Sequence, residues 1–138
     1  MNQDPRDDSD LTYQIIGLAM RVHRSLGPGL LESVYETCLC HELTQAGISF
    51  RRQISLPLQY DGVDLDCGYI ADIIVDDQVI LELKAVDLIQ KLHEAQLLTY
   101  MRLSLCRIGL LINFNTVSLT DGHQTPRAMT VKVKPPIR

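Results

Sequence analysis

Two charged residues lie close together in an otherwise apolar stretch of the sequence. In residues 79–86, VILELKAV, only Glu82 and Lys84 are not hydrophobic. An apolar run of this length predicts a strand buried in a sheet, and on a strand these two side chains point to the same side. They either form an ion pair, with each other or with a neighbouring strand, or take part in chemistry.

The preceding apolar stretch, GYIADIIV, contributes a third charged group, Asp72. Whether Asp72 meets Glu82 depends on the turn between the two strands. A two-residue turn pairs residue 75 with 78 and places the two acids on opposite faces. A three-residue turn, or a bulge, pairs 75 with 79 and 72 with 82, so that both carboxylates share a face. Both registers stay open, because both faces of these strands are apolar.

A pair of converging carboxylates would bind a divalent cation, which relieves their mutual repulsion. Mg²⁺ prefers oxygen ligands and keeps several of its waters, and Mn²⁺ is an alternative. Next to such a metal, Lys84 could orient a water, help to deprotonate it, or neutralise charge that develops on a phosphate. The three side chains therefore predict metal-dependent hydrolysis of a phosphodiester.

The elements that must position these residues follow from the hydrophobic periodicity. Residues 48–60 alternate only in part and include Pro57, which indicates an edge or irregular strand, and Asp61-Gly62 predicts a hairpin turn. The order of the elements predicts an α/β domain with a mixed sheet. Helices are predicted over residues 11–26, 30–46 and 88–103, and strands over 64–75, 78–86, 106–114 and from 128 onward.

Polar residues on two of the predicted helices are further candidates. Glu32 falls between Leu39 and Leu43 on the apolar arc of its helix, so it faces inward or lies at the edge of the core. Glu42 also falls on this arc and would snorkel or pair with a basic residue. On the last helix Gln96 and Tyr100 are four apart and share a face, with His93 close to it. These residues either border the contact between helix and sheet or belong to a site.

Taken together, the motifs resemble those of the PD-(D/E)xK nuclease superfamily. Asp72 with E82-L83-K84 is similar to its signature, and QLLTY, residues 96–100, resembles the QxxxY motif of the RecB-like branch. GLLESVY, residues 29–35, resembles the motif that names the GxxExxY protein family. The resemblance extends over residues 13–120. It implies a restriction-endonuclease-like αβββαβ core, with a mixed central sheet flanked by helices.

The resemblance also implies roles for single residues. Lys84 would be the catalytic lysine, and Gln96 and Tyr100 would buttress the site or contact the substrate backbone. The sequence departs from the pattern at Ala71, where the superfamily has proline, and at Ile70, where GxxExxY relatives often carry arginine. The second departure removes a contact to a phosphate. The ligands of Mg²⁺ or Mn²⁺ would be Glu32, Asp72, Glu82 and the main-chain carbonyl of Leu83.

Composition narrows the class of protein. The chain of 138 residues is 46% hydrophobic, which predicts one domain over residues 11–138 after a disordered acidic tail at 1–10. It has neither an apolar run that could cross a bilayer nor a signal-peptide pattern, and we expect a cytoplasmic protein that does not act at a membrane. Four cysteines without a CxxC pair indicate reduced thiols.

The net charge of the chain restricts the kind of nucleic-acid binding that can be expected. The net charge of −4 argues against a protein that coats nucleic acid non-specifically. It still allows a local basic rim, for which the candidates are Arg21 with Arg24, Arg51 with Arg52, and Lys132 with Lys134.

Two functions fit the sequence. The first is a metal-dependent nuclease acting on DNA or RNA, which the full set of acids and Lys84 favours. The alternative is a non-catalytic interaction or oligomerisation module on the same fold. In that case the apolar strand at 106–114, or an edge strand near residue 130, would build the interface of a homo-oligomer.

Overall fold

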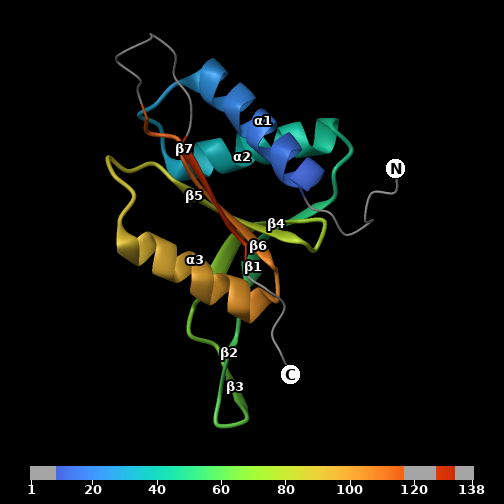
Figure 1. Cartoon of the computed structure of the whole chain (residues 1–138), viewed down its shortest axis with the longest axis vertical. Coiled ribbons are helices and arrows are strands. Elements are labelled where there is room, and N and C mark those ends of the chain that lie inside the picture. The colour runs from blue at the N-terminus through green and yellow to red at the C-terminus, as the bar shows by residue number, and fades with distance from the viewer. Residues whose placement is uncertain (1–8, 117–126, 133–138) are drawn as a thin grey trace.

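A mixed sheet with helices on both faces is the architecture of the computed structural model, which describes residues 9–116 and 127–132 (Figure 1). Helices α1 (Ser9–Leu26) and α2 (Glu32–Gln45) cover one face, and α3 (Lys91–Ser104) covers the other. The predicted α/β fold is confirmed. The tail predicted over residues 1–10 is too long by two residues, because Ser9 and Asp10 belong to α1. Residues 1–8 lie outside the described part of the chain.

Five strands form the sheet in the order β1-β4-β5-β6-β7. Strands β5 and β6 are parallel and the other neighbours antiparallel. A parallel pair needs a long connection, and α3 provides it. The strands are β1 (Phe50–Ser55), β4 (Ile70–Val75), β5 (Val79–Lys84), β6 (Ile108–Asn113) and β7 (Arg127–Lys132).

A separate two-stranded hairpin, β2 (Leu58–Tyr60) and β3 (Val63–Leu65), projects from this body at its lower end (Figure 1). The predicted Asp61-Gly62 turn is confirmed, since Tyr60 pairs with Val63 and both turn residues have positive φ. The predicted strand over 64–75 is wrong in its extent, because residues 66–69 separate β3 from β4. Gly68 has a φ of 77° there, and its amide donates to the Asp66 carboxylate.

The apolar runs are explained by two hydrophobic clusters, one on each face of the sheet. Burial on both faces accounts for the continuous run of β6, whose six residues are all buried as predicted. Facing α1 and α2 are Ile73, Val75, Val79, Leu81 and Leu83, and facing α3 are Ala71, Ile74, Ile80 and Leu111.

Helix α3 lies very close to β6. A Cβ added at Gly109 would be 2.7 Å from the sulfur of Met101 and 2.9 Å from Cδ1 of Leu97. The glycine therefore permits the approach of the helix that carries Gln96 and Tyr100. No helix of the described ranges is both long enough and apolar enough to cross a membrane.

Candidate active site at the ends of β4 and β5

The turn between β4 and β5 sets the register on which the site depends. Asp76 and Asp77 both have left-handed φ angles, 52° and 53°, and the Gln78 amide donates to the Val75 carbonyl. Such a hydrogen-bonded turn would normally pair Val75 with Gln78. The ladder instead pairs Val75 with Val79 and Ile73 with Leu81, so Gln78 is an additional residue. This is the register that sets Asp72 opposite Glu82.

Asp72 and Glu82 lie where the ladder between β4 and β5 stops. The Leu83 amide donates to Oδ2 of Asp72 at 2.8 Å, and the Asp72 amide donates to Oε1 of Glu82 at 3.2 Å. Each acid thus satisfies a main-chain group on the opposite strand, which holds both carboxylates between the two strands. The other oxygen of each carboxylate is left over from these bonds and can accept a further ligand.

Burial makes the negative charge of this pair costly. Glu82 is only 7% exposed, and burial, followed by repulsion from Asp72, raises its pKa from 4.5 to about 8. Burial raises the pKa of Asp72 from 3.8 to about 6, although the hydrogen bond from the Leu83 amide acts in the opposite direction. A cation bound to these two acids would stabilise their ionised forms.

Lys84 is half-buried at the end of β5, and its charge acts on both carboxylates by lowering their pKa values. Its ammonium group makes no hydrogen bond or ion pair with residues 9–116 or 127–132. The alternative of an ion pair with Glu82 or with a neighbouring strand is therefore not what this part of the structure contains. A lysine near buried acids, without a fixed partner, remains available for a reacting group.

Glu32 begins α2 and lies at the edge of the core, exposed, with Oε1 accepting the Ala85 amide at 3.3 Å. Its position depends on the preceding loop, which Tyr35 holds. The Tyr35 hydroxyl donates to the Gly27 carbonyl at 2.6 Å and accepts the Leu30 amide at 3.2 Å. Tyr35 thus fixes the loop before α2, and Glu32 ties the start of this helix to the residue after β5.

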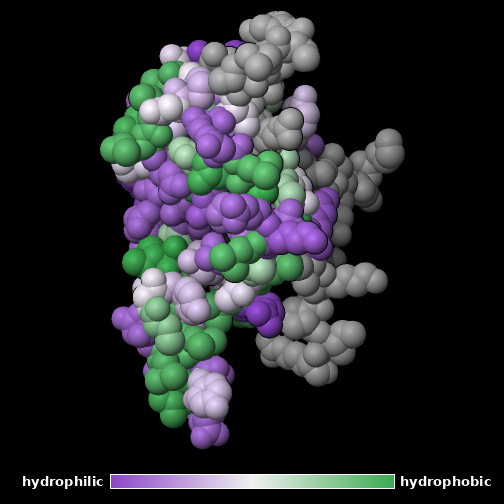
Figure 2. Space-filling view, turned by 90° about the vertical axis from the view of Figure 1, so that its left-hand side faces the viewer, coloured by the Kyte–Doolittle hydropathy of each residue, from purple (hydrophilic) through white to green (hydrophobic). Residues whose placement is uncertain are grey.

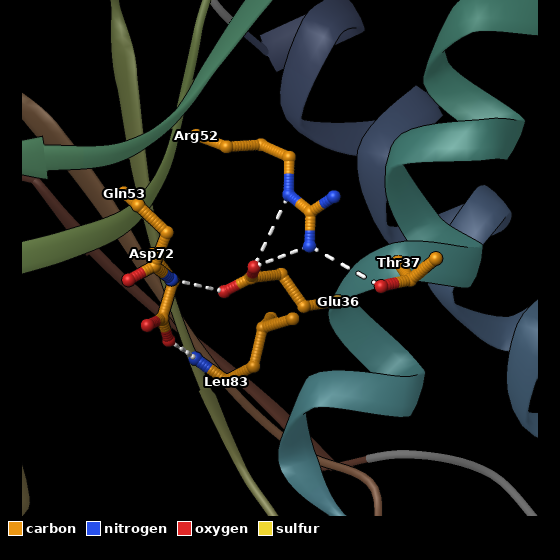
Figure 3. A network of polar contacts seen from close by, with 6 residues as sticks. All are labelled: Glu36, Thr37, Arg52, Gln53, Asp72 and Leu83. Carbon is orange, nitrogen blue, oxygen red and sulfur yellow. Dashed lines mark hydrogen bonds and ion pairs between the residues drawn. The ribbon is translucent and has the colours of Figure 1, made fainter.

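The buried acid of α2 is Glu36, one turn after Glu32, which the sequence prediction missed (Figure 3). Its carboxylate accepts two hydrogen bonds from Arg52, at 2.7 and 3.2 Å, and one from the Gln53 side chain at 2.7 Å. Gln53 lies opposite Asp72 on β1 and has a φ of 50°. A non-glycine residue in this conformation costs about 1–3 kcal/mol, so contacts around the site must stabilise it.

A cavity of about 320 Å³ lies between α2 and Asp72. A larger one, of about 530 Å³, lies along β6 and β7 and is not lined by Asp72. The smaller cavity is the one that belongs to the candidate active site, because Asp72 lines it. Its lining consists of Glu32, Ser33, Glu36, Gln53, Asp72 and Leu83.

Helix α3 brings one of its two candidate residues to the carboxylates. Burial raises the pKa of Tyr100, and the charges of Glu82 and Asp72 raise it further, which places its hydroxyl near them. Gln96 is exposed and its side chain bonds to no residue of the described ranges. His93 has a structural role, because its Nδ1 accepts the Gln90 amide in a capping box at the start of α3.

A model of the PD-(D/E)XK nuclease superfamily matches residues 9–125 of the chain. The chain belongs to this superfamily. None of the curated proteins compared with the chain matches it. The superfamily predicted from Asp72 and the E82-L83-K84 stretch is confirmed, whereas the GxxExxY family and the RecB-like branch stay predictions.

Nucleases of this superfamily usually use Mg²⁺ or Mn²⁺, and the residues present fit such an ion in part. Within the described ranges no three His, Cys, Asp or Glu side chains are grouped so that they could hold a metal. Glu32 is therefore not part of a three-carboxylate cluster in this conformation. Asp72 and Glu82 nevertheless supply hard oxygen donors, and Mg²⁺ is commonly held by one or two carboxylates and waters. Leu83 contacts the site through its amide, to Asp72.

Three of the candidate residues for a local basic rim are paired with acids. Ion pairs join Arg21 to Glu42, Arg51 to Asp77 and Arg52 to Glu36, and the first confirms a partner for Glu42. Lys134 lies outside the described residues. These pairs leave little free positive charge near β1 for a phosphate backbone.

Asn113 is a second residue that sequence analysis missed. It is buried at the end of β6, and its amide group accepts the Val86 amide at 3.1 Å and donates to the Val86 carbonyl at 2.8 Å. This double contact fixes the chain directly after Lys84. The available signal was an amide side chain at the end of an otherwise apolar run, in a position where a buried polar group needs a partner.

Proposed function

We propose that this protein is a metal-dependent nuclease that hydrolyses phosphodiester bonds of DNA or RNA. The observation that carries the proposal is the pair of hydrogen-bonded carboxylates, half-buried Asp72 and buried Glu82, beside Lys84, whose ammonium group has no partner among the described residues. Neither acid has a basic side chain within ion-pair distance in the described part of the chain. Ionising two adjacent acids, one buried and one half-buried, without a positive partner is costly, and a cation would remove this cost.

The residues divide the work of hydrolysis between them. Asp72 and Glu82 would hold Mg²⁺ or Mn²⁺, which when bound supplies a Lewis acid and lowers the pKa of a water. Lys84 lies near enough to attract the attacking water or the scissile phosphate and to neutralise charge that grows on its oxygens. The Leu83 and Asp72 amides fix the orientation of the carboxylates. Tyr100 closes the α3 side, in keeping with the RecB-like motif, and Glu32 borders the cavity.

A second candidate is an interaction module without catalysis, and the hairpin β2–β3 favours it. The exposed apolar residues of this arm include Tyr60, Val63 and Leu65. Figure 2 shows hydrophobic side chains gathered on the lower end of the molecule, where the arm projects. An isolated two-stranded hairpin is at best marginally stable in water, so a partner that covers it would stabilise it.

Cleavage of defined nucleic acids tests the proposal. The purified full chain is incubated with labelled single- and double-stranded DNA and RNA, with Mg²⁺, Mn²⁺ or EDTA. We expect cleavage of at least one substrate with metal and none with EDTA. Lys84→Ala is the control for contaminating nucleases, since it should lower the rate by at least a hundredfold while the fold persists.

Two results would refute the nuclease. One is cleavage by Lys84→Ala at the rate of the wild type, and the other is the absence of any cleavage by a folded wild type that binds Mg²⁺. Lys91→Ala is the matched control, because it removes an exposed lysine from the start of α3. It should leave the rate within about twofold.

A further inference from the structure

An aromatic pair beside the carboxylates is not accounted for by the chemistry of cleavage. The rings of Tyr69 and Tyr100 are 5.8 Å apart at 63°, an edge-to-face arrangement. Such an arrangement leaves at least one broad ring face uncovered by the partner ring. Tyr69 is 36% exposed, so the uncovered aromatic surface is open to a ligand.

The position of Tyr69 is fixed by its main chain. Its carbonyl accepts the Leu56 amide at 2.8 Å, just before β4 begins. Asp72 follows three residues later, on β4, and the charges of Asp72 and Glu82 act on Tyr100 of α3. The aromatic pair therefore borders the site where the phosphate would react.

The segment of chain around Tyr69 contributes no basic side chain that would bind a phosphate. Between Arg52 and Lys84 the sequence contains no lysine, arginine or histidine. This segment instead contains apolar residues such as Ile70, which is exposed, and acidic residues such as Asp64 and Asp66. Acidic groups repel the nucleic-acid backbone, whereas a tyrosine ring stacks on any base because every base has a π-face.

Resting on the nuclease function proposed above, we propose that Tyr69 stacks on an unpaired base adjacent to the scissile phosphate. A base inside a duplex has both faces covered by its neighbours, so the contact requires a single strand or a frayed end. The pair of Tyr69 and Tyr100 then selects unpaired nucleic acid. Tyr100 supports the ring of Tyr69 from the side, and Tyr69 provides the contact to the substrate.

Binding of single-stranded oligodeoxynucleotides tests this contact. A fluorescein-labelled 12-mer, with Ca²⁺ replacing Mg²⁺ to suppress cleavage, is compared with versions that lack one base at successive positions. We expect wild type to bind the intact strand about tenfold more tightly than one abasic version, or about 1.4 kcal/mol. Tyr69→Phe should keep this preference and Tyr69→Leu should abolish it. Tyr13→Leu, which removes an exposed tyrosine on α1, should bind as wild type does.

The outcomes separate this inference from the nuclease function. A wild type that binds every abasic version as it binds the intact strand, or that binds none of them, overturns the stacking. So does Tyr69→Leu if it keeps the preference. If wild type cleaves nucleic acid in Mg²⁺ but gives any of these binding results, the stacking is refuted and the nuclease function is not. If wild type prefers the intact strand, Tyr69→Leu loses this preference and wild type does not cleave, the stacking is supported and the nuclease function is refuted.

Discussion

Replacing Glu82 by glutamine should make the metal-free protein more stable at alkaline pH. The pKa of Glu82 is raised by burial and by the charge of Asp72, from 4.5 to about 8. The folded state therefore binds the proton more tightly than the unfolded state does. The stability that this proton contributes is fully present below pH 4.5 and is lost as the pH rises to about 8. Glu82→Gln carries no such proton and escapes this loss.

The size of the effect follows from the shift. At about 1.4 kcal/mol per pKa unit, the shift of Glu82 corresponds to a loss of up to about 5 kcal/mol in wild type between pH 4.5 and 8.5. Glutamine keeps an oxygen that can accept the Asp72 amide, as Oε1 of Glu82 does. Its buried NH₂ group adds a cost of about 1–3 kcal/mol. That cost is independent of pH, so it does not enter the slope.

Urea unfolding in EDTA, at pH values between 4.5 and 8.5, measures this slope. The free energy of unfolding of wild type should fall relative to that of Glu82→Gln across the whole window. Asp64→Asn, which changes an exposed carboxylate on β3, is the control and should follow wild type. Parallel curves for wild type and Glu82→Gln would show that burial does not raise this pKa, and would remove the electrostatic argument for a cation.

Two further predictions concern the metal and the loop before α2. Mg²⁺ at 100 times its Kd should stabilise wild type by about 2.7 kcal/mol in thermal unfolding, whereas the stability of Asp72→Ala should not change. An equal increase in the stability of both proteins would show that the ion binds elsewhere. Tyr35→Phe keeps the ring that stacks on Phe114 at 4.5 Å but loses the hydroxyl bonds to Gly27 and Leu30, so urea unfolding should show a loss of about 2 kcal/mol. The exposed Tyr13→Phe is its control, and equal stability of the two variants would contradict the role of the hydroxyl.

The sequence was sufficient to identify the acids of the site, but not to predict that their side chains lie close together. Charged residues within buried strands identify Asp72, Glu82 and Lys84, since apolar runs seldom contain them without a reason. The register depends on the conformation of the turn, where Asp76 and Asp77 are left-handed and Gln78 is additional. No hydrophobic pattern distinguishes the two registers when both faces are buried, so this part required the structure.

Glu36 shows a different limit of the sequence. Its spacing of four from Glu32 places both acids on one side of α2, and that signal was present. What the helix could not reveal is its partner Arg52, which comes from β1 and turns Glu36 into a paired acid. The same limit applies to the strand predicted over 64–75, which is divided because the hairpin ends in a tight bend at Asp66 and Gly68.

Insertions and deletions in surface turns are usually tolerated. The turn after β4 should tolerate the deletion of Gln78. A chain without Gln78 could close with an ordinary two-residue turn and still pair Val75 with Val79. Deleting one residue from 73–75 or from 79–81 would instead rotate one acid to the opposite face. Three residues separate each acid from the turn, 73–75 on one strand and 79–81 on the other. The alignment of the acids is thus encoded by a count of residues, and the identities of those residues can vary as long as they stay apolar.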